Sequence, residues 1–185
     1  GNVETKDLSL EKLSSSISFV SQDNFLFDMT IKENIRLGNK EATDEEIIEV
    51  CKKSACHDFI MKLDKGYDTV IGEGGASLSG GEKQRLSIAR AMMKSAPIII
   101  LDEATANVDP ENEKELMQAI EELTRKKTVI MIAHRLKTVR NADKIVVIDE
   151  GKIVQEGKHE ELIKQEGIYK TFINARELAV SWKIA

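Results

Sequence analysis

Three short apolar runs, rich in isoleucine and valine, lie in the second half of the chain. They do not alternate with polar residues as the strands of a half-exposed sheet do, so they predict buried strands of a parallel sheet covered on both faces. A hairpin is expected to follow the third run and to turn at Glu150-Gly151. The runs are Ile98–Leu101, Thr128–Ile132 and Lys144–Ile148.

Helical stretches are expected between these strands. Asp109 is a suitable N-cap and Pro110 a suitable first helical residue for the stretch that follows Ile98–Leu101. Strands that alternate with helices predict an α/β fold with right-handed crossover connections. Four apolar residues of this stretch recur on one helical face: Leu116, Ala119, Ile120 and Leu123.

The segment from about residue 25 to residue 94 has a different, mostly helical pattern. Thr43 and Glu46 have the spacing of a capping box, and Ile47, Ile48, Cys51 and Ala55 follow them. We interpret this segment as a helical subdomain inserted into the α/β core.

The composition excludes several classes of protein. With 27 lysines and arginines against 32 aspartates and glutamates, the net charge of −5 gives no basic footprint for a general nucleic-acid binder. Cys51 and Cys56 lack the spacing of a zinc site, so we interpret them as reduced thiols of a cytosolic protein. The apolar runs are too short to span a bilayer, and any membrane part is expected outside this chain.

Two carboxylates directly follow the first apolar run. Ligands of open α/β sheets bind beyond the carboxyl ends of the strands, so Asp102 is a candidate to hold Mg²⁺, directly or through water. Glu103 is a candidate to orient and polarise a water for attack on a phosphate. A strand that ends in a solvated acidic turn is the alternative.

A glycine-rich turn precedes a helical stretch at Leu78–Arg85. Ser79 and Glu82 have capping-box spacing, and Gly80 and Gly81 let a ligand approach the backbone closely. The N-terminus of such a helix presents N–H groups and the positive end of a dipole, which together bind anions such as phosphates. A plain capped helix is the alternative.

Together these segments resemble the ABC ATPases. Leu78–Arg85 matches the signature motif of that family residue for residue, and Ile98–Glu103 resembles its Walker B strand with the catalytic glutamate. Val20–Asp23 resembles the Q-loop and Ile132–Leu136 the segment of the switch histidine. The D-loop-like segment departs from the family, because Ala106-Asn107-Val108-Asp109 stands where Ser-Ala-Leu-Asp is usual.

The resemblance implies a P-loop NTPase-like fold, with a mostly parallel sheet, that binds ATP with Mg²⁺. It implies that Gln22 contacts the metal or the attacking water, and that His134 bonds the γ-phosphate beside Asp102 and Glu103. The aspartate of the D-loop is retained as Asp109, so its role is expected to be retained. The resemblance further implies that four residues bind ATP held by a partner domain: Ser79, Gly80, Gly81 and Glu82.

Two further segments resemble exporters within the family. Asn24–Phe27 with Thr30–Ile35 is similar to the segment that follows the Q-loop, and Thr69–Gly75 is similar to the x-loop. Glu73 would then contact the coupling helices of a membrane domain. The interval between Gln22 and Leu78 is too short for the long coiled coil of chromosome-maintenance relatives.

The phosphate-binding loop of the family, G-x-x-x-x-G-K-[ST], has no match in the chain. Gly151-Lys152 and Gly157-Lys158 are followed by Ile153 and His159 rather than by serine or threonine. We therefore expect an N-terminally truncated domain, or missing preceding residues, that binds ATP weakly or not at all by itself. The expected division is residues 1–24 and 95–176 as ATPase core, 25–94 as helical subdomain and 177–185 as tail.

The resemblance implies the ATP-hydrolysing domain of an exporter, at the cytoplasmic face of a membrane although the chain itself is soluble. The expected partners are a second ATPase domain, identical or different, and a transmembrane domain, with no nucleic acid. Two alternatives stay open. One is a soluble, non-transport ABC ATPase, for example one that acts on ribosomes, and the other is a non-enzymatic docking fragment.

Overall fold

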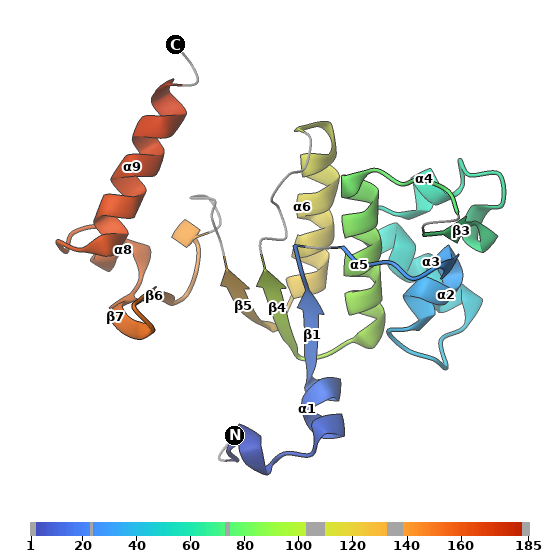
Figure 1. Cartoon of the computed structure of the whole chain (residues 1–185), viewed down its shortest axis with the longest axis horizontal. Helices are drawn as coiled ribbons and strands as arrows, with labels where there is room; N and C mark the ends of the chain where they lie inside the picture. Colours follow the sequence, from blue (N-terminus) through green and yellow to red (C-terminus); the bar gives the residue numbers. More distant parts are fainter. Residues whose placement is uncertain (1–2, 23, 73–74, 103–109, 133–138, 183–185) are drawn as a thin grey trace. The chain divides into compact units, whose positions relative to one another are not determined.

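The computed structural model describes residues 3–22, 24–72, 75–102, 110–132 and 139–182. The chain divides into two compact units, Gly1–Ile132 and Ala133–Ala185. The first unit contains η1 (Thr5–Asp7), α1 (Leu10–Ser16), β1 (Ile17–Val20), β2 (Met29–Thr30), α2 (Ile31–Arg36), α3 (Asp44–Lys53), α4 (His57–Ile60), η2 (Gly66–Asp68), β3 (Val70–Ile71), α5 (Gly80–Lys94), β4 (Ile98–Asp102), α6 (Pro110–Thr124) and β5 (Thr128–Ile132) (Figure 1). The second contains β6 (Ile145–Asp149), β7 (Lys152–Gly157), α8 (His159–Leu162) and α9 (Ile168–Trp182).

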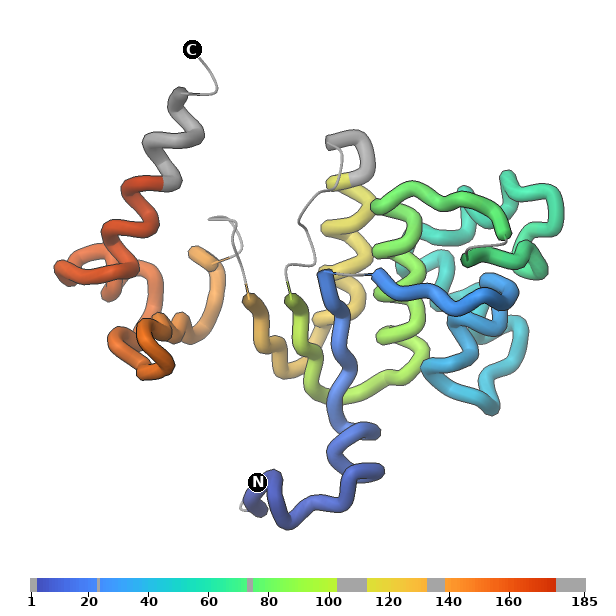
Figure 2. The backbone as a smooth tube through the Cα atoms, in the orientation of Figure 1, coloured from blue at the N-terminus to red at the C-terminus, as the bar shows by residue number. Residues whose placement is uncertain are grey.

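The first unit is built on a three-stranded sheet in the order β1-β4-β5. Both pairs of strands are parallel, with Val20 opposite Leu101 and Asp102 opposite Ile132. The three strands therefore run in the same direction and end at one edge (Figure 2). The predicted α/β class, with a parallel sheet flanked by helices, is confirmed.

Helix α6 packs on this sheet through the face that the sequence predicts. Leu116, Ala119, Ile120 and Leu123 are all buried, in a core that also contains Ile99 and Leu101 of β4. Pro110 is the first residue of the helix, as expected. The expected N-cap, Asp109, lies outside the described residues.

The segment between β1 and β4 folds mainly into helices around a core of its own, to which α2, α3, α4 and α5 contribute. The predicted capping box of α3 is present. The backbone N–H of Thr43 donates to Oε2 of Glu46 at 2.8 Å, and the backbone N–H of Glu46 donates to Oγ1 of Thr43 at 3.2 Å. A short antiparallel pair, β2 with β3, adds to the predicted helices. The expected domain boundaries stay a prediction.

Helix α5 is shared between the two cores. Ile88 and Ala91 pack with the sheet and α6, whereas Leu86, Ala89 and Met93 pack with the helical segment. The helix lies between the sheet on one side and α2 and α3 on the other (Figure 1). Its position therefore depends on both cores at once.

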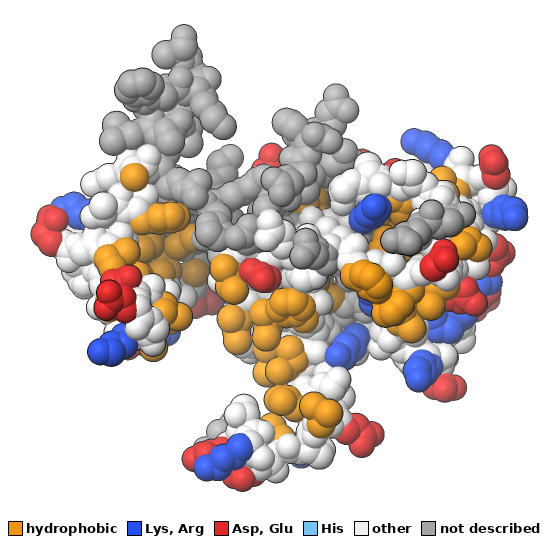
Figure 3. Space-filling view, viewed as in Figure 1, with side chains coloured by type: hydrophobic (Ala, Val, Ile, Leu, Met, Phe, Trp, Pro, Cys, Tyr) orange, Lys and Arg blue, Asp and Glu red, His pale blue; other side chains and the backbone are white. Residues whose placement is uncertain are grey.

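The prediction that all three apolar runs are buried on both faces is wrong for two of them. All five residues of β5 are exposed, and Ile130 and Ile132 keep 54% and 52% of their surface accessible. Of the residues in these three strands, Val20, Ile99 and Leu101 belong to the core formed with α5 and α6. Apolar side chains gather on the accessible face of the sheet (Figure 3). An apolar run therefore predicts a strand, but its burial depends on what covers each face.

The third run forms β6, in the second unit. It pairs antiparallel with β7 through a turn at Glu150 and Gly151, and both of these residues have positive φ. The predicted hairpin is therefore confirmed. Within this second unit, Ile145, Leu162, Tyr169 and Ile173 form a small core of their own.

The two cysteines are free and fully buried, as the prediction of reduced thiols requires. Burial raises the pKa of the Cys56 thiol to about 12, so it stays protonated and unreactive at neutral pH. Among the helices that the structure describes, none combines the length and the apolar composition needed to cross a membrane.

One glycine sets how closely α2 approaches α5. A Cβ atom on Gly38, just after α2, would lie 2.4 Å from the backbone oxygen of Arg90 and 3.0 Å from the backbone nitrogen of Lys94. Backbone atoms cannot move aside as a flexible side chain can. Any side chain at position 38 would therefore push the two helices apart.

We expect Gly38→Ala to lower the free energy of unfolding by about 1–3 kcal/mol, because the added methyl group overpacks a contact between backbones. Gly80→Ala is the matched control, since a Cβ there meets nothing within 4 Å. Chemical denaturation of both variants followed by circular dichroism measures the difference. Equal unfolding midpoints would contradict the tight contact.

Candidate nucleotide-binding site

The carboxyl ends of the three parallel strands form the first part of the candidate site. Asp102 is the last residue of β4, it is half-buried, and it lies opposite Ile132, the last residue of β5. Gln22 follows the end of β1 by two residues and is exposed. The register thus brings the backbone positions of these predicted residues to the same edge of the sheet.

The backbone at Gln22 is tied to α5. The side-chain nitrogen of Asn24 donates to the backbone oxygen of Gln22 at 3.3 Å and to Oε1 of Gln84 at 3.3 Å. Gln84 belongs to α5 and is only 3% exposed. No sequence pattern predicts a role for Asn24 or Gln84, because a side chain that links two distant segments has no periodic spacing.

Four predicted site residues lie outside the described residues: Glu73, Glu103, Asp109 and His134. Two of them follow described strands closely in the sequence. Glu103 comes directly after Asp102, the last residue of β4, and His134 comes two residues after the end of β5. Their roles stay predictions.

The N-terminus of α5 forms the second part of the candidate site. Oγ of Ser79 accepts the N–H of Glu82 at 3.3 Å, and Oε2 of Glu82 accepts the N–H of Ser79 at 2.8 Å. The predicted capping box is therefore present. A Cβ on Gly80 would meet nothing within 4 Å, so there is open space beside this residue, whereas Gly81 is buried.

This helix end suits an anion. The first N–H groups of an α-helix have no acceptor within the helix, and the capping box supplies acceptors for those of Ser79 and Glu82. The N–H groups of Gly80 and Gly81 are thus directed along the helix axis, where the dipole also favours negative charge. Phosphate oxygens are the ligands that this arrangement fits.

A buried arginine joins α5 to both of its neighbours. Arg85 is 3% exposed, its Nη1 lies 3.0 Å from Oε2 of Glu115 on α6, and its guanidinium lies 5.4 Å from the ring centroid of Phe59 on α4. A buried cation needs such partners. From the sequence, Arg85 is only part of the matched motif, and the structure adds its role in holding α5.

A pocket of about 430 Å³ separates the segment after Gln22 from the x-loop-like segment. The x-loop-like segment turns tightly on itself, because a Cβ on Gly75 would lie 2.3 Å from the backbone oxygen of Val70. Gly72 has φ of +124°, and a Cβ there would lie 2.9 Å from Cα of Asp28. Large apolar side chains of both segments are exposed, with Phe25 at 67% and Val70 at 45%. The pocket is lined by Asn24, Phe25, Leu26, Ile71, Gly72 and Lys83, among others.

The residues present fit MgATP in their chemistry. The carboxylate of Asp102 and the amide of Gln22 are oxygen donors, which Mg²⁺ prefers alongside waters and phosphate oxygens. The open N-terminus of α5 fits phosphate, but it belongs to a different part of the fold from the sheet edge.

We expect Ser79→Ala to lower the free energy of unfolding by about 1 kcal/mol, because the N–H of Glu82 loses its side-chain acceptor. Ser79→Thr keeps a hydroxyl at the same position and is the control. Urea denaturation of the 185-residue chain measures both effects. If threonine costs as much stability as alanine, the hydroxyl does not cap the helix.

The sequence of this chain matches a protein family and several known proteins. Residues 1–106 match the family described as ABC transporter. An uncharacterized ABC transporter ATP-binding protein of Sinorhizobium fredii is 53% identical over 167 residues, which cover 90% of this chain and 28% of that protein. The ATP-dependent lipid A-core flippase of Francisella novicida is 50% identical over 173 residues, 93% of this chain and 29% of that protein.

A protein of Staphylococcus aureus, provisionally named as a multidrug export ATP-binding/permease protein, is 50% identical over 94% of this chain and 30% of its own length. The chain thus spans 28 to 30% of the length of these curated relatives. The family match covers more than half of the chain and includes β1, β4 and the first turn of α5. This chain belongs to the ABC transporter family.

Proposed function

We propose that this chain is the ATP-binding and ATP-hydrolysing domain of an exporter, in which hydrolysis drives transport of a substrate across a membrane. The observation that carries the proposal is the common edge of the parallel strands, where Asp102 ends β4 and Gln22 follows β1. The relatives named for multidrug export and for a lipid A-core flippase support an exporter.

In this proposal the sheet edge carries the chemistry. Asp102 and Gln22 would hold Mg²⁺, which when bound neutralises charge on the phosphates. Glu103 would accept a proton from the attacking water and so polarise it. His134 would donate a hydrogen bond to the γ-phosphate and fix its orientation.

The N-terminus of α5 would act on a second nucleotide. We propose a head-to-tail pair of ATPase domains, in which the first turn of α5 binds the γ-phosphate of ATP held by the partner domain. Ser79, Gly80, Gly81 and Glu82 would supply this contact, and Asp109 would lie at the junction of the two domains. The open space around Gly80 supports this role, since a phosphate needs close approach to the backbone.

A transmembrane domain is the second proposed partner, with the chain at the cytoplasmic face of the membrane. Exposed Phe25 lines the pocket of about 430 Å³, and exposed Phe27 and Val70 are next in sequence to its lining residues Leu26 and Ile71, which supports docking of an apolar segment there. Glu73, in the x-loop-like segment, would add a polar contact to the coupling helices.

Glu103→Gln tests the catalytic role in the full-length protein. We expect ATP hydrolysis to fall by a factor of about a hundred or more, because an amide cannot accept the proton of the attacking water, while MgATP still binds. Glu121→Gln is the matched control, since it makes the same change at an exposed position of α6. An unchanged rate for Glu103→Gln would refute the enzymatic role and favour a docking fragment.

We also propose that these 185 residues by themselves bind MgATP weakly or not at all, because no segment of them supplies the lysine and backbone cradle of a phosphate-binding loop. Titration calorimetry of the chain with MgATP measures this directly. Heat too small to fit is the expected result. Tight binding would contradict the proposal and require a phosphate site that the assigned residues do not include.

A further inference from the structure

Arg90 contacts a segment that lies more than fifty residues earlier in the chain. It projects from α5 and donates three hydrogen bonds, each from a different nitrogen. Nε donates to the backbone oxygen of Asn34 at 3.1 Å, Nη2 donates to Oδ1 of Asn34 at 3.1 Å, and Nη1 donates to the backbone oxygen of Phe25 at 3.2 Å. The guanidinium also lies 5.8 Å from the ring centroid of Phe27. The planar guanidinium therefore holds two points of one segment against the helix.

Asn34 fixes the rest of that segment. Its side chain is 1% exposed, and its Oδ1 accepts the N–H of Phe27 at 3.0 Å in addition to the bond from Arg90. Its Nδ2 donates to the backbone oxygens of Phe27 and Thr30 at 3.0 and 3.1 Å. The loop from residue 25 to residue 30 is thus bonded to one buried amide, and that amide is bonded to α5.

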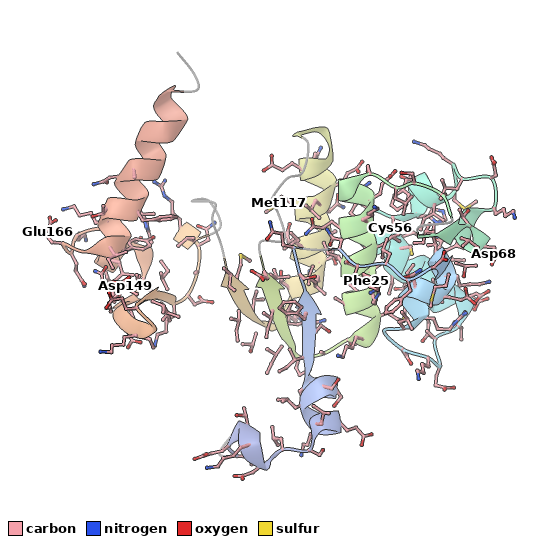
Figure 4. All side chains as sticks on the ribbon, in the orientation of Figure 1. Phe25, Cys56, Asp68, Met117, Asp149 and Glu166 are labelled. Atoms are coloured by element: carbon pink, nitrogen blue, oxygen red, sulfur yellow. The ribbon has the colours of Figure 1, made fainter. Side chains whose placement is uncertain are left out.

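The two phenylalanines of this loop form what we call the aromatic hook, Phe25 and Phe27. Their rings meet edge to face with centroids 4.9 Å apart, and they remain 67% and 42% exposed. In Figure 4 the labelled Phe25 lies over α5, in agreement with the bond from Arg90 to its backbone oxygen. The hook is held from behind while its rings face outward.

A second connection lies nearer the N-terminus of α5. Asn24, the residue before the hook, bonds Oε1 of Gln84, which is six residues before Arg90 on the same helix. The loop is therefore attached to α5 at two places along its length. A segment attached at two points cannot slide or pivot independently of the helix.

We infer that Arg90 is a positioning residue that makes the aromatic hook and the N-terminus of α5 move as one body. The inference rests on the proposed function and deepens it. A nucleotide of the partner domain would act on Ser79 at one end of α5, and the membrane domain would contact the hook. Arg90 touches neither ligand, so it governs the transmission between them and not the chemistry.

Lysine cannot take over this role. Its single nitrogen lacks the fixed fork that reaches Phe25 and both acceptors of Asn34. Arg90→Lys therefore keeps the charge and the aliphatic stem but releases the hook. Lys94→Ala is the matched control, because it removes a cation from the same helix one turn later and leaves all three acceptors with Arg90.

Hydrogen exchange in the full-length protein tests the inference, with Glu103→Gln as the common background so that MgATP persists. Addition of MgATP is expected to slow exchange both at the first turn of α5 and in residues 24–34. With Arg90→Lys added, we expect the response to persist at α5 but to be lost in residues 24–34. The N–H of Phe27 should then exchange about tenfold faster, because its acceptor is no longer fixed.

The outcomes separate the two proposals. No response at the first turn of α5 refutes the proposed function and with it the inference. A response at α5 without one in residues 24–34, in the background that still has Arg90, overturns the inference alone and needs no Arg90 variant to fold. An Arg90→Lys protein whose residues 24–34 respond as fully as those of Lys94→Ala also overturns it.

Discussion

The packing of α5 in two hydrophobic cores is the constraint on which the rest of the first unit depends. Ile88 and Ala91 face the sheet, while Leu86, Ala89 and Met93 face the helical segment. Buried Arg85 adds polar contacts to α6 and α4. Either core would have to lose apolar contacts for α5 to shift alone, so the position of the helix is set by the sheet and the helical segment together.

Helix α5 carries its open N-terminal turn and its bonds to the preceding loop at different positions along its length. Open space lies beside Gly80 in its first turn, and further along the helix Gln84 bonds Asn24 and Arg90 bonds the backbone of Phe25. Gly38 allows α2 to come close enough for this attachment. A binding surface and a docking surface are thus placed on one rigid element.

Sequence patterns correctly predicted the features that depend on residues close together in the chain. The strand at Ile98, the apolar face of α6 and the two capping boxes depend on residues a few positions apart, so the sequence was sufficient for them. The exposure of β5 depends on what covers each face of the sheet, which no run of five residues encodes. The contacts of Arg90 with Phe25 and Asn34 join segments that are far apart in the sequence, so no sequence spacing predicts them.

The cap of α5 uses the hydroxyl of Ser79 only as a hydrogen-bond acceptor. A hydroxyl can both accept and donate hydrogen bonds, and Oγ of Ser79 accepts one from the N–H of Glu82. The cap does not use the hydroxyl proton, which therefore stays available for a hydrogen bond to another acceptor. Aspartate would cap the helix as well but would bring a negative charge and no proton. In the proposed function, the hydroxyl would therefore reach a phosphate from a side chain whose oxygen the cap already holds in place.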